Sequence, residues 1–160
     1  MKIGILSDTH NNTTNIKKTI EIFNLRHVDM VCHAGDFSST ESAQLFIKLK
    51  MPFIAVFGNN DFNTYDLTKI IEPFGQINLA PYIFSIDDKS IMLSHYIVTE
   101  NTKNINYVIY GHTHKAKIYK SGNTLFINPG EVCGYRYGNP SIAILNTDND
   151  NCEIINLFND

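Results

Sequence analysis

The chain has 160 residues, of which 43% are hydrophobic and 18% are charged, and its formal net charge is −3. This length fits one domain over residues 1–160, since domains usually have about 100–200 residues, and it suffices to bury a core. The weak negative charge, without any Lys/Arg block, argues against a dedicated nucleic-acid surface, and no apolar stretch approaches the roughly 20 residues of a membrane-spanning helix.

Short apolar runs and helical patterns alternate over residues 1–60. Strands are expected at residues 2–7, 28–32 and 53–57, and helices at 13–26 and 39–50. We expect Thr13 or Thr14 to cap the first helix, because a hydroxyl accepts a hydrogen bond from a free backbone N–H. Strands that alternate with helices in this way are typical of a parallel sheet with crossover helices.

Strands dominate the second half, where turn signals such as Ser121-Gly122-Asn123 separate short apolar runs. One further helix is expected at residues 65–73. Strands are expected at residues 77–79, 82–86, 90–94, 107–110, 116–120, 124–128, 141–146 and 153–157. A βαβ half followed by a β-rich half predicts an α/β fold in which two sheets pack face to face with helices outside.

Five short polar segments each follow directly after one of these apolar runs. They are Asp8-Thr9-His10, Gly35-Asp36, Gly58-Asn59-Asn60-Asp61, Ser94-His95 and Gly111-His112-Thr113-His114. Every segment contributes Asp, Asn or His, which are the oxygen and imidazole ligands that divalent cations accept. Because a rigid scaffold can bring such groups together in loops at strand ends, the sequence predicts a metal-dependent hydrolase.

Each segment also has a simpler interpretation when it is taken alone. Asp8-x-His10 could be an Asx turn with a surface histidine, Gly35-Asp36 a plain turn, and His95 a hydrogen-bonded histidine at a strand end. The pair His112-x-His114 is harder to explain by packing, because a buried unpaired imidazole is costly. Five independent turns of this composition are improbable in one small domain. Together they hold enough ligands for two ions, about 3.5–4 Å apart and sharing one carboxylate.

The order of these motifs resembles that of the calcineurin-like metallophosphoesterases, in particular the small YfcE-like phosphodiesterases. The resemblance runs from Lys2 to about Phe158 and includes the segment Asn128-Pro129-Gly130 after the last histidines. It implies the metallophosphoesterase fold, a two-sheet β-sandwich flanked by helices in the four-layer order α/β/β/α. It also implies a metal-dependent phosphoesterase activity.

The resemblance further implies two divalent transition-metal ions, with Mn²⁺ as the first candidate and Ni²⁺, Fe or Zn²⁺ as alternatives. One ion would be held by Asp8, His10 and His114, and the other by Asn59, His95 and His112, with Asp36 bridging both. The mechanism implied is in-line attack on phosphorus by a hydroxide held between the ions. The candidate catalytic residues are Asp36, His95 and Asn60.

Two positions depart from the family pattern. Asn60 stands where larger phosphatases of the superfamily have a histidine that protonates the leaving group, and an amide cannot act as a general acid. Asn60 can still donate a hydrogen bond to a phosphate oxygen, so substrates with stable leaving groups are favoured. The family's His-Gly-His reads His95-Tyr96-Ile97 here, which changes the rim of the expected pocket.

Several other side chains are expected to contact the substrate or to support the site. Asn11, Asn60 and Arg136 are candidates for phosphate contacts, since amides donate hydrogen bonds and a guanidinium can bind phosphate through two of them. An ordinary loop arginine is the alternative interpretation of Arg136. Asp61 and His33 are expected to lie outside the ligand set, and His27 to lie on the surface.

The sequence thus predicts a dinuclear phosphodiesterase that acts on a small or nucleotide-like phosphodiester. The alternatives are a phosphomonoesterase with the same site and a catalytically weak metal-binding scaffold, as in the retromer relative of this fold. A mononuclear zinc hydrolase leaves Asp36 and Asn59 unexplained. Three widely spaced cysteines and no secretory signal predict a cytoplasmic protein. Exposed edge strands would permit a homo-oligomer, and no membrane partner is expected.

Overall fold

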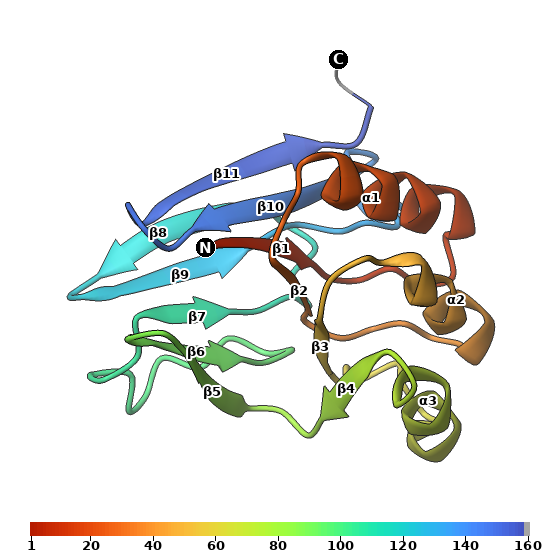
Figure 1. The fold of residues 1–160 in the computed structure, drawn as a ribbon, viewed down its shortest axis with the longest axis horizontal. Helices are drawn as coiled ribbons and strands as arrows, with labels where there is room; N and C mark the ends of the chain where they lie inside the picture. Colours follow the sequence, from red (N-terminus) through yellow and green to blue (C-terminus); the bar gives the residue numbers. More distant parts are fainter. Residues whose placement is uncertain (159–160) are drawn as a thin grey trace.

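Two mixed sheets stack face to face in the computed structural model, which describes residues 1–158 (Figure 1). The first sheet has the strand order β11 (Asn151–Asn156), β10 (Ser141–Asn146), β1 (Lys2–Leu6), β2 (Met30–His33), β3 (Phe53–Val56), β4 (Gly75–Asn78). Strands β1 to β4 are parallel, as the alternation of strands and helices predicted, whereas β10 is antiparallel to both β1 and β11.

The second sheet has five strands, and its three central strands are parallel. Its order is β5 (Tyr82–Ile86), β6 (Lys89–Leu93), β7 (Tyr107–Ile109), β9 (Thr124–Asn128), β8 (Lys117–Ser121). The edge strands β5 and β8 are antiparallel to their neighbours. Every strand expected from the sequence is present, with each end within two residues of its expected position.

The α-helices cover the outer face of the first sheet (Figure 1). They are α1 (Thr13–Leu25), α2 (Thr40–Gln44) and α3 (Thr64–Ile71), and a 3-10 turn, η1 (Leu45–Lys48), continues α2 where one long helix was expected. The predicted cap of α1 was wrong: Asn12 caps it, accepting a hydrogen bond from the Asn15 N–H at 3.1 Å while its own amide donates to Cys133 O at 2.8 Å. Among residues 1–158, no helix combines the length and apolar character needed to cross a membrane.

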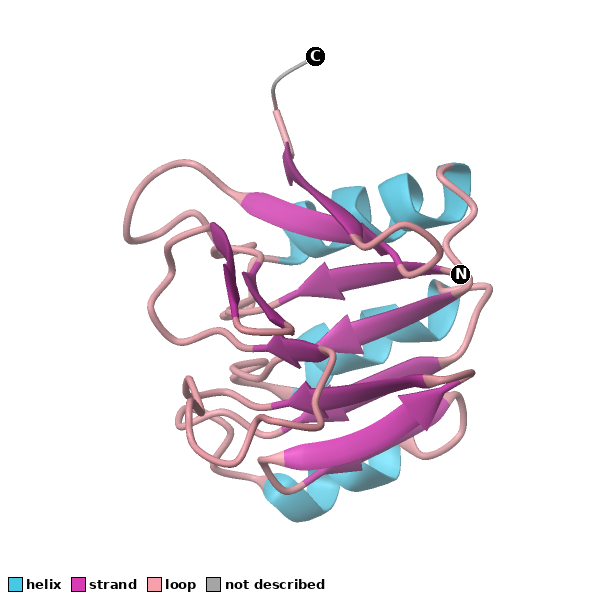
Figure 2. Cartoon of the chain, turned by 90° about the vertical axis from the view of Figure 1, so that its left-hand side faces the viewer, coloured by secondary structure: helices cyan, strands magenta, loops and turns pink. Residues whose placement is uncertain are grey.

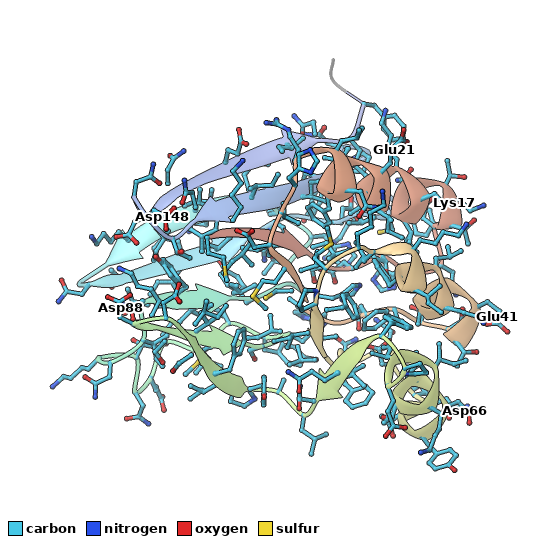
Figure 3. All side chains as sticks on the ribbon, viewed as in Figure 1. Lys17, Glu21, Glu41, Asp66, Asp88 and Asp148 are labelled. Carbon is cyan, nitrogen blue, oxygen red and sulfur yellow. The ribbon has the colours of Figure 1, made fainter. Side chains whose placement is uncertain are left out.

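Alternating side chains of the first sheet form two separate apolar layers. In β1, Ile3 and Ile5 face the second sheet, whereas Leu6 faces the helices. Gly4 allows α1 to approach closely, because a Cβ atom there would lie 2.8 Å from the Phe23 ring. The outward sides of the helices carry exposed charges (Figure 3), among them Lys17, Glu21, Glu41 and Asp66.

A loop covers the outer face of the second sheet, where the four-layer order predicts a helix. Val98 and Ile105, on the segment 94–106 between β6 and β7, pack against Val108 and Phe126 of that face. This segment also carries the polar residues that follow β6, which leaves too few residues for a helix. The two-sheet sandwich flanked by helices is as predicted, but in the described chain its fourth layer is this loop.

The carboxyl ends of β1, β2, β3, β6 and β7 lie at the same end of the sandwich. Long loops gather at this end of the strands (Figure 2). Parallel strands necessarily deliver the residues that follow them to one edge of a sheet, and two stacked sheets place two such edges side by side. The polar segments identified in the sequence all follow these strands.

Candidate metal centre

The five polar segments meet at this end of the sandwich. Backbone hydrogen bonds join them in pairs, since the Asp8 N–H donates to Gly35 O over 3.0 Å and the Gly111 N–H donates to His95 O over 3.1 Å. The His112 N–H connects the two sheets by donating to the Asp8 carboxylate over 3.1 Å, across 104 positions of the sequence. Segments that are distant in the chain therefore form one cluster.

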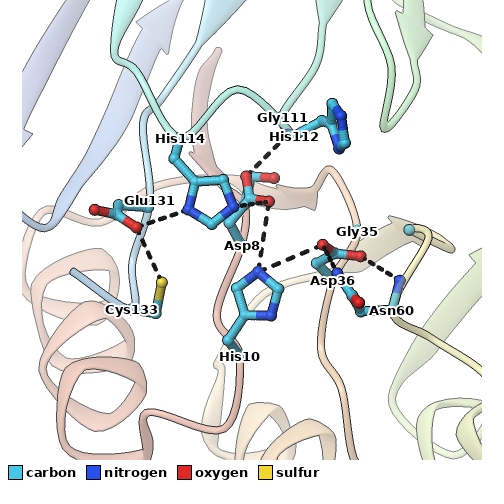
Figure 4. Close-up of polar contacts among 12 residues, drawn as sticks. Asp8, His10, Gly35, Asp36, Asn60, Gly111, His112, His114, Glu131 and Cys133 are labelled. Carbon is cyan, nitrogen blue, oxygen red and sulfur yellow. Dashed lines mark hydrogen bonds and ion pairs between the residues drawn. The ribbon is translucent and has the colours of Figure 1, made fainter. Parts of the chain in front are cut away.

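Asp36 is shared by two sides of this cluster, and Figure 4 shows it between His10 and Asn60. Its Oδ2 atom is 3.4 Å from His10 Nε2 and 3.5 Å from His95 Nε2, so one carboxylate oxygen faces two imidazoles. Asn60 holds the carboxylate through two hydrogen bonds of 2.8 Å, one from its backbone N–H to Oδ1 and one from its side-chain amide to Oδ2. Asp36 is 1% exposed, so its charge requires a nearby partner.

Asp8 and His114 lie beside His10 on one side of Asp36. The Asp8 Oδ1 atom is 3.4 Å from His114 Nε2 and 3.9 Å from His10 Nε2. The rings of His10 and His114 are stacked, with their centroids 5.2 Å apart. The three residues that the family resemblance assigns to one ion therefore point their ligand atoms toward one another and toward Asp36.

Asn59, His95 and His112 lie on the other side of Asp36. The Asn59 Oδ1 atom is 2.9 Å from both His95 Nε2 and His112 Nδ1. The two histidine rings meet edge to face, with their centroids 5.1 Å apart. The structure thus brings together all seven residues that were expected to bind metal, in two groups that share Asp36.

Three of the histidines are anchored through Nδ1, which leaves Nε2 directed into the cluster. The Nδ1 contacts are Ser38 Oγ at 3.0 Å for His10, Ala34 O at 2.7 Å for His95 and Glu131 Oε2 at 2.7 Å for His114. A carbonyl or carboxylate can only accept, so Nδ1 of His95 and of His114 carries a proton, and in the neutral imidazole the lone pair is on Nε2. Metal-binding histidines are oriented in this way.

Five of the seven residues have a left-handed backbone conformation. Their φ angles are 54° at Asp8, 37° at His10, 66° at Asp36, 62° at His112 and 63° at His114. Residues with a Cβ atom rarely adopt this region, and such positions cost on the order of 1 kcal/mol or more each. The hydrogen bonds between the loops maintain this strain, which indicates that the orientation of these side chains serves a function.

Two buried atoms of the cluster have no hydrogen-bond partner in the described chain. They are Asp8 Oδ1 and His10 Nε2, which face each other. Burial raises the pKa of Asp8, although a hydrogen bond from Ser7 and the charges of His114 and His95 act in the opposite direction. A divalent cation would satisfy both atoms and favour the charged carboxylate. The combination of carboxylate, amide and imidazole donors suits a first-row divalent ion.

Asp61 supports the cluster from outside the ligand set, as expected. It is buried and accepts hydrogen bonds of 2.7–2.9 Å from four backbone N–H groups, those of Asp36, Phe37, Ser38 and Gly58. One carboxylate therefore joins the loop after β2 to the loop after β3. His27 is exposed just beyond the end of α1, also as expected.

The sequence analysis did not assign a role to Glu131. This residue is fully buried, and its Oε2 atom lies 2.7 Å from His114 Nδ1 and 3.2 Å from Cys133 Sγ. Burial acts to raise the pKa of Glu131, but hydrogen bonds from His114 and from backbone N–H groups outweigh it and lower the pKa below its ordinary value. A glutamate directly after Asn128-Pro129-Gly130 was visible in the sequence as a possible partner for a metal-binding histidine.

Glu131→Gln is expected to weaken metal binding by about 10- to 100-fold, the usual effect of losing a carboxylate behind a metal-binding histidine. The glutamine amide at position 131 has no negative charge to attract the Nδ1 proton of His114. It therefore stabilises less well the ring orientation in which His114 Nε2 points into the cluster. Calorimetric titration of metal-free protein with Mn²⁺ measures this change. Glu153→Gln, an exposed glutamate on β11, is the matched control, and equal affinities of the two variants would contradict the role of Glu131.

His33 is a fully buried histidine that supports the loop after β2. Its Nδ1 accepts a hydrogen bond from the Gly35 N–H at 3.0 Å, so its proton is on Nε2, which lies 3.3 Å from Thr9 Oγ1. Its ring stacks on Phe37 with centroids 3.8 Å apart. Burial, together with the charges of His95 and His10, lowers its pKa well below the ordinary value, so the native state holds His33 neutral.

This neutral histidine predicts a pH dependence of stability. Below about pH 6.5 the unfolded chain protonates His33 but the folded chain does not, so the free energy of unfolding should fall by up to about 1.4 kcal/mol per pH unit. Urea denaturation at pH 7.5 and 5.5 measures the fall. In His33→Gln this contribution is removed, so the variant should lose less stability than the wild type over the same interval. An unchanged pH dependence would contradict the prediction.

The expected substrate-contacting residues lie around the rim of the cluster. Asn11 and Arg136 are exposed, whereas Asn60 is half-buried against Asp36. Tyr96, which replaces the family's glycine, is 52% exposed, and its ring centroid lies 4.4 Å from that of His112. Tyr96 therefore forms a wall beside His112, and the substrate contacts of the other three stay predictions.

Comparisons with known proteins identify the family. The family model described as the calcineurin-like phosphoesterase superfamily domain matches residues 1–150. Over 156 residues the chain is 40% identical to a phosphodiesterase of Methanocaldococcus jannaschii, covering 92% of this chain and 94% of the relative. The structure of an archaeal phosphodiesterase has a TM-score of 0.92 and 37% identity, covering 98% of this chain and 99% of its own. YfcE, a phosphoesterase from E. coli, shares the fold with a TM-score of 0.71 and 21% identity, over 98% and 100% of the two chains. The chain therefore belongs to the calcineurin-like phosphoesterase superfamily, as its motifs predicted, and is an enzyme of the hydrolase class.

Proposed function

We propose that this protein is a phosphodiesterase that uses two divalent transition-metal ions, with Mn²⁺ the first candidate, to hydrolyse a small or nucleotide-like phosphodiester. One ion would be held by Asp8, His10 and His114, the other by Asn59, His95 and His112, and Asp36 would be shared. The observation that carries the proposal is the position of Asp36 Oδ2, which faces His10 Nε2 at 3.4 Å and His95 Nε2 at 3.5 Å. Similarity to a phosphodiesterase supports the choice of a diester substrate.

A site for a single zinc ion built on His112 and His114 is less well supported. His114 Nε2 points toward Asp8, whereas His112 Nδ1 points toward Asn59, so the two rings belong to different groups. A mononuclear site would also leave the buried pair of Asp36 and His95 without a role. The two groups around one carboxylate favour two ions.

When bound, the two ions would supply an activated water and positive charge for the phosphate. The chain's own residues position the ligand atoms that would hold these ions. Donation of the His95 Nδ1 proton to Ala34 O directs Nε2 toward Asp36, and Asn60 fixes the Asp36 carboxylate with one amide hydrogen. The second amide hydrogen of Asn60 is then available for a phosphate oxygen, but Asn60 cannot give up a proton. The leaving group must therefore depart as an anion or take its proton from water.

Metal analysis and two nitrophenyl esters test the proposed function. Protein purified without chelator should contain up to two transition ions per chain, and with Mn²⁺ it should hydrolyse bis-p-nitrophenyl phosphate faster than p-nitrophenyl phosphate. A chelator should remove this activity and added Mn²⁺ should restore it. Faster hydrolysis of the monoester would favour a phosphomonoesterase, and neither turnover nor tight metal binding would favour a scaffold.

Asn60→His is expected to raise kcat for a diester with an alcohol leaving group by about tenfold or more, since a positioned general acid contributes roughly 10²- to 10⁴-fold. The same change should alter kcat for bis-p-nitrophenyl phosphate far less, because nitrophenolate needs no proton to leave. The two rates are compared in the variant and the wild type, with Asn123→His, in an exposed turn, as the control. Equal effects on both substrates would refute the role given to Asn60.

A further inference from the structure

A cavity of about 320 Å³ adjoins the metal centre, and His114 is the one residue of its lining that the proposed catalysis uses. Its lining residues are His114, Lys115, Ala116, Tyr137, Asn139 and Ser141. This volume lies at the lower end of the range for small-molecule sites, about 300–1,000 Å³. Because the cavity shares His114 with the metal centre, a group bound in it would be a near neighbour of a phosphate bound by the ions.

Two cations lie against the ring of Tyr137, and one of them, Lys115, lines this cavity. Lys115 Nζ is 5.2 Å from the centroid of the Tyr137 ring, and the guanidinium carbon of Arg136 is 5.8 Å from it. The ring face attracts both cations and limits where they lie. Within residues 1–158, neither Lys115 nor Arg136 has a carboxylate oxygen within 4.0 Å, unlike Lys69 and Lys89. Both positive charges are therefore available to a ligand.

The cavity carries no negative charge of its own. None of its six lining residues has a carboxylate. Glu131 lies behind the cavity, but it is buried and its oxygens already accept hydrogen bonds from His114 and from the backbone N–H groups of Arg136 and Tyr137. The lining thus has one cation, Lys115, and no carboxylate in a chain with a net charge of −3, which suits an anionic ligand.

Glu131 also fixes the position of the cavity relative to the metal centre. Its Oε1 atom accepts the Tyr137 N–H at 2.6 Å, while its Oε2 atom contacts His114 Nδ1 at 2.7 Å. Lys115 directly follows His114 in the sequence. A single buried carboxylate therefore joins the expected metal ligand to the backbone of the residue that carries the aromatic ring.

We propose that this cavity binds a second phosphate group of the substrate, so that the preferred diester carries a further terminal phosphate, as a 5′-phosphorylated dinucleotide does. Lys115 binds this phosphate within the cavity, Arg136 adds positive charge beside it, and Tyr137 positions both cations. The inference rests on the proposed phosphodiesterase function and specifies its substrate class.

The test compares the dinucleotide ApA with its 5′-phosphorylated form pApA as substrates of the Mn²⁺-loaded enzyme. In the wild type, the terminal phosphate should raise kcat/KM about tenfold, mainly through a lower KM, which corresponds to one charge-assisted contact. In Lys115→Gln this advantage should fall to about twofold. Lys117→Gln is the matched control, because Lys117 lies 4.8 Å from the Tyr119 ring on β8 but does not line the cavity.

Two results would overturn the inference: equal kcat/KM for ApA and pApA in the wild type, or equal loss of the advantage in the Lys115 and Lys117 variants. Turnover of both dinucleotides and of bis-p-nitrophenyl phosphate without a preference for pApA would reject this subsite and leave the phosphodiesterase function intact. If neither dinucleotide is hydrolysed, the Kd values of ApA and pApA for the wild type decide the subsite, and the phosphodiesterase function fails only if bis-p-nitrophenyl phosphate is not hydrolysed either. Inorganic phosphate is the competitor: phosphate bound in this cavity should remove the advantage of pApA without inhibiting ApA, whereas equal inhibition of both substrates would place it at the metal centre and not in the cavity.

Discussion

Asp36→Asn is expected to lower kcat for bis-p-nitrophenyl phosphate by about 10³-fold and to reduce the metal content from two ions per chain to at most one. The amide keeps the volume of the carboxylate and one acceptor for the Asn60 N–H. It has no negative charge, however, and when its oxygen accepts that N–H, its NH2 group replaces the Oδ2 atom that faces His10 and His95. Metal analysis of the purified variant and steady-state kinetics with added Mn²⁺ measure both effects.

The control for this variant is His27→Asn, at the end of α1. His27 is exposed and has a φ of 51°, a conformation that asparagine tolerates well, so this change should leave metal content and turnover unaltered. Full activity of Asp36→Asn with two bound ions would show that Asp36 does not bridge them. Loss of activity in both variants would indicate general damage to the fold.

Asp61→Ala is expected to lower the free energy of unfolding by about 3–5 kcal/mol, although Asp61 is outside the ligand set. The substitution leaves four backbone N–H groups without their acceptor, and each buried donor left unpaired costs about 1–3 kcal/mol, part of which water entering the gap can recover. These N–H groups belong to the loops that hold Asp36 and Gly58. Urea denaturation in the presence of a chelator measures the change without any contribution from bound metal.

Asp88→Ala provides the comparison for Asp61→Ala. Asp88 is exposed in the turn between β5 and β6 (Figure 3), and its removal should change stability by no more than about 0.5 kcal/mol. If Asp61→Ala were as stable as this control, the loops after β2 and β3 would not depend on the shared carboxylate. If the folded Asp61→Ala variant also binds Mn²⁺ more weakly than the folded wild type, the Asp61 carboxylate also positions Asp36 for metal binding.

Sequence reasoning located the strands well because their patterns are local. Short apolar runs bounded by Asp, Asn and Gly determine where strands such as β1 and β7 end, and each expected strand end was correct to within two residues. Helix caps were less predictable. The α1 cap is Asn12 because its amide is held by Cys133 O, a contact with a loop that is 121 positions away in the sequence.

In the metal centre, too, local motifs were predictable from the sequence, whereas contacts between distant segments were not. The polar segments were recognisable one by one, and the family resemblance arranged them into two groups, which the structure reproduces in space. Glu131 was missed because its role depends on a contact with His114 that only folding creates. The pairing of Lys115 with Tyr137 depends in the same way on two loops that meet beside β9.

The sequence by itself determined which chemical groups follow each strand and which family the chain resembles, because both are written in short contiguous motifs. The tertiary structure decided which of these groups face one another, how Asp61 and Glu131 hold them, and where the cavity lined by Lys115 opens beside His114. Such arrangements depend on sheet order and on hydrogen bonds between distant loops, which local patterns do not encode.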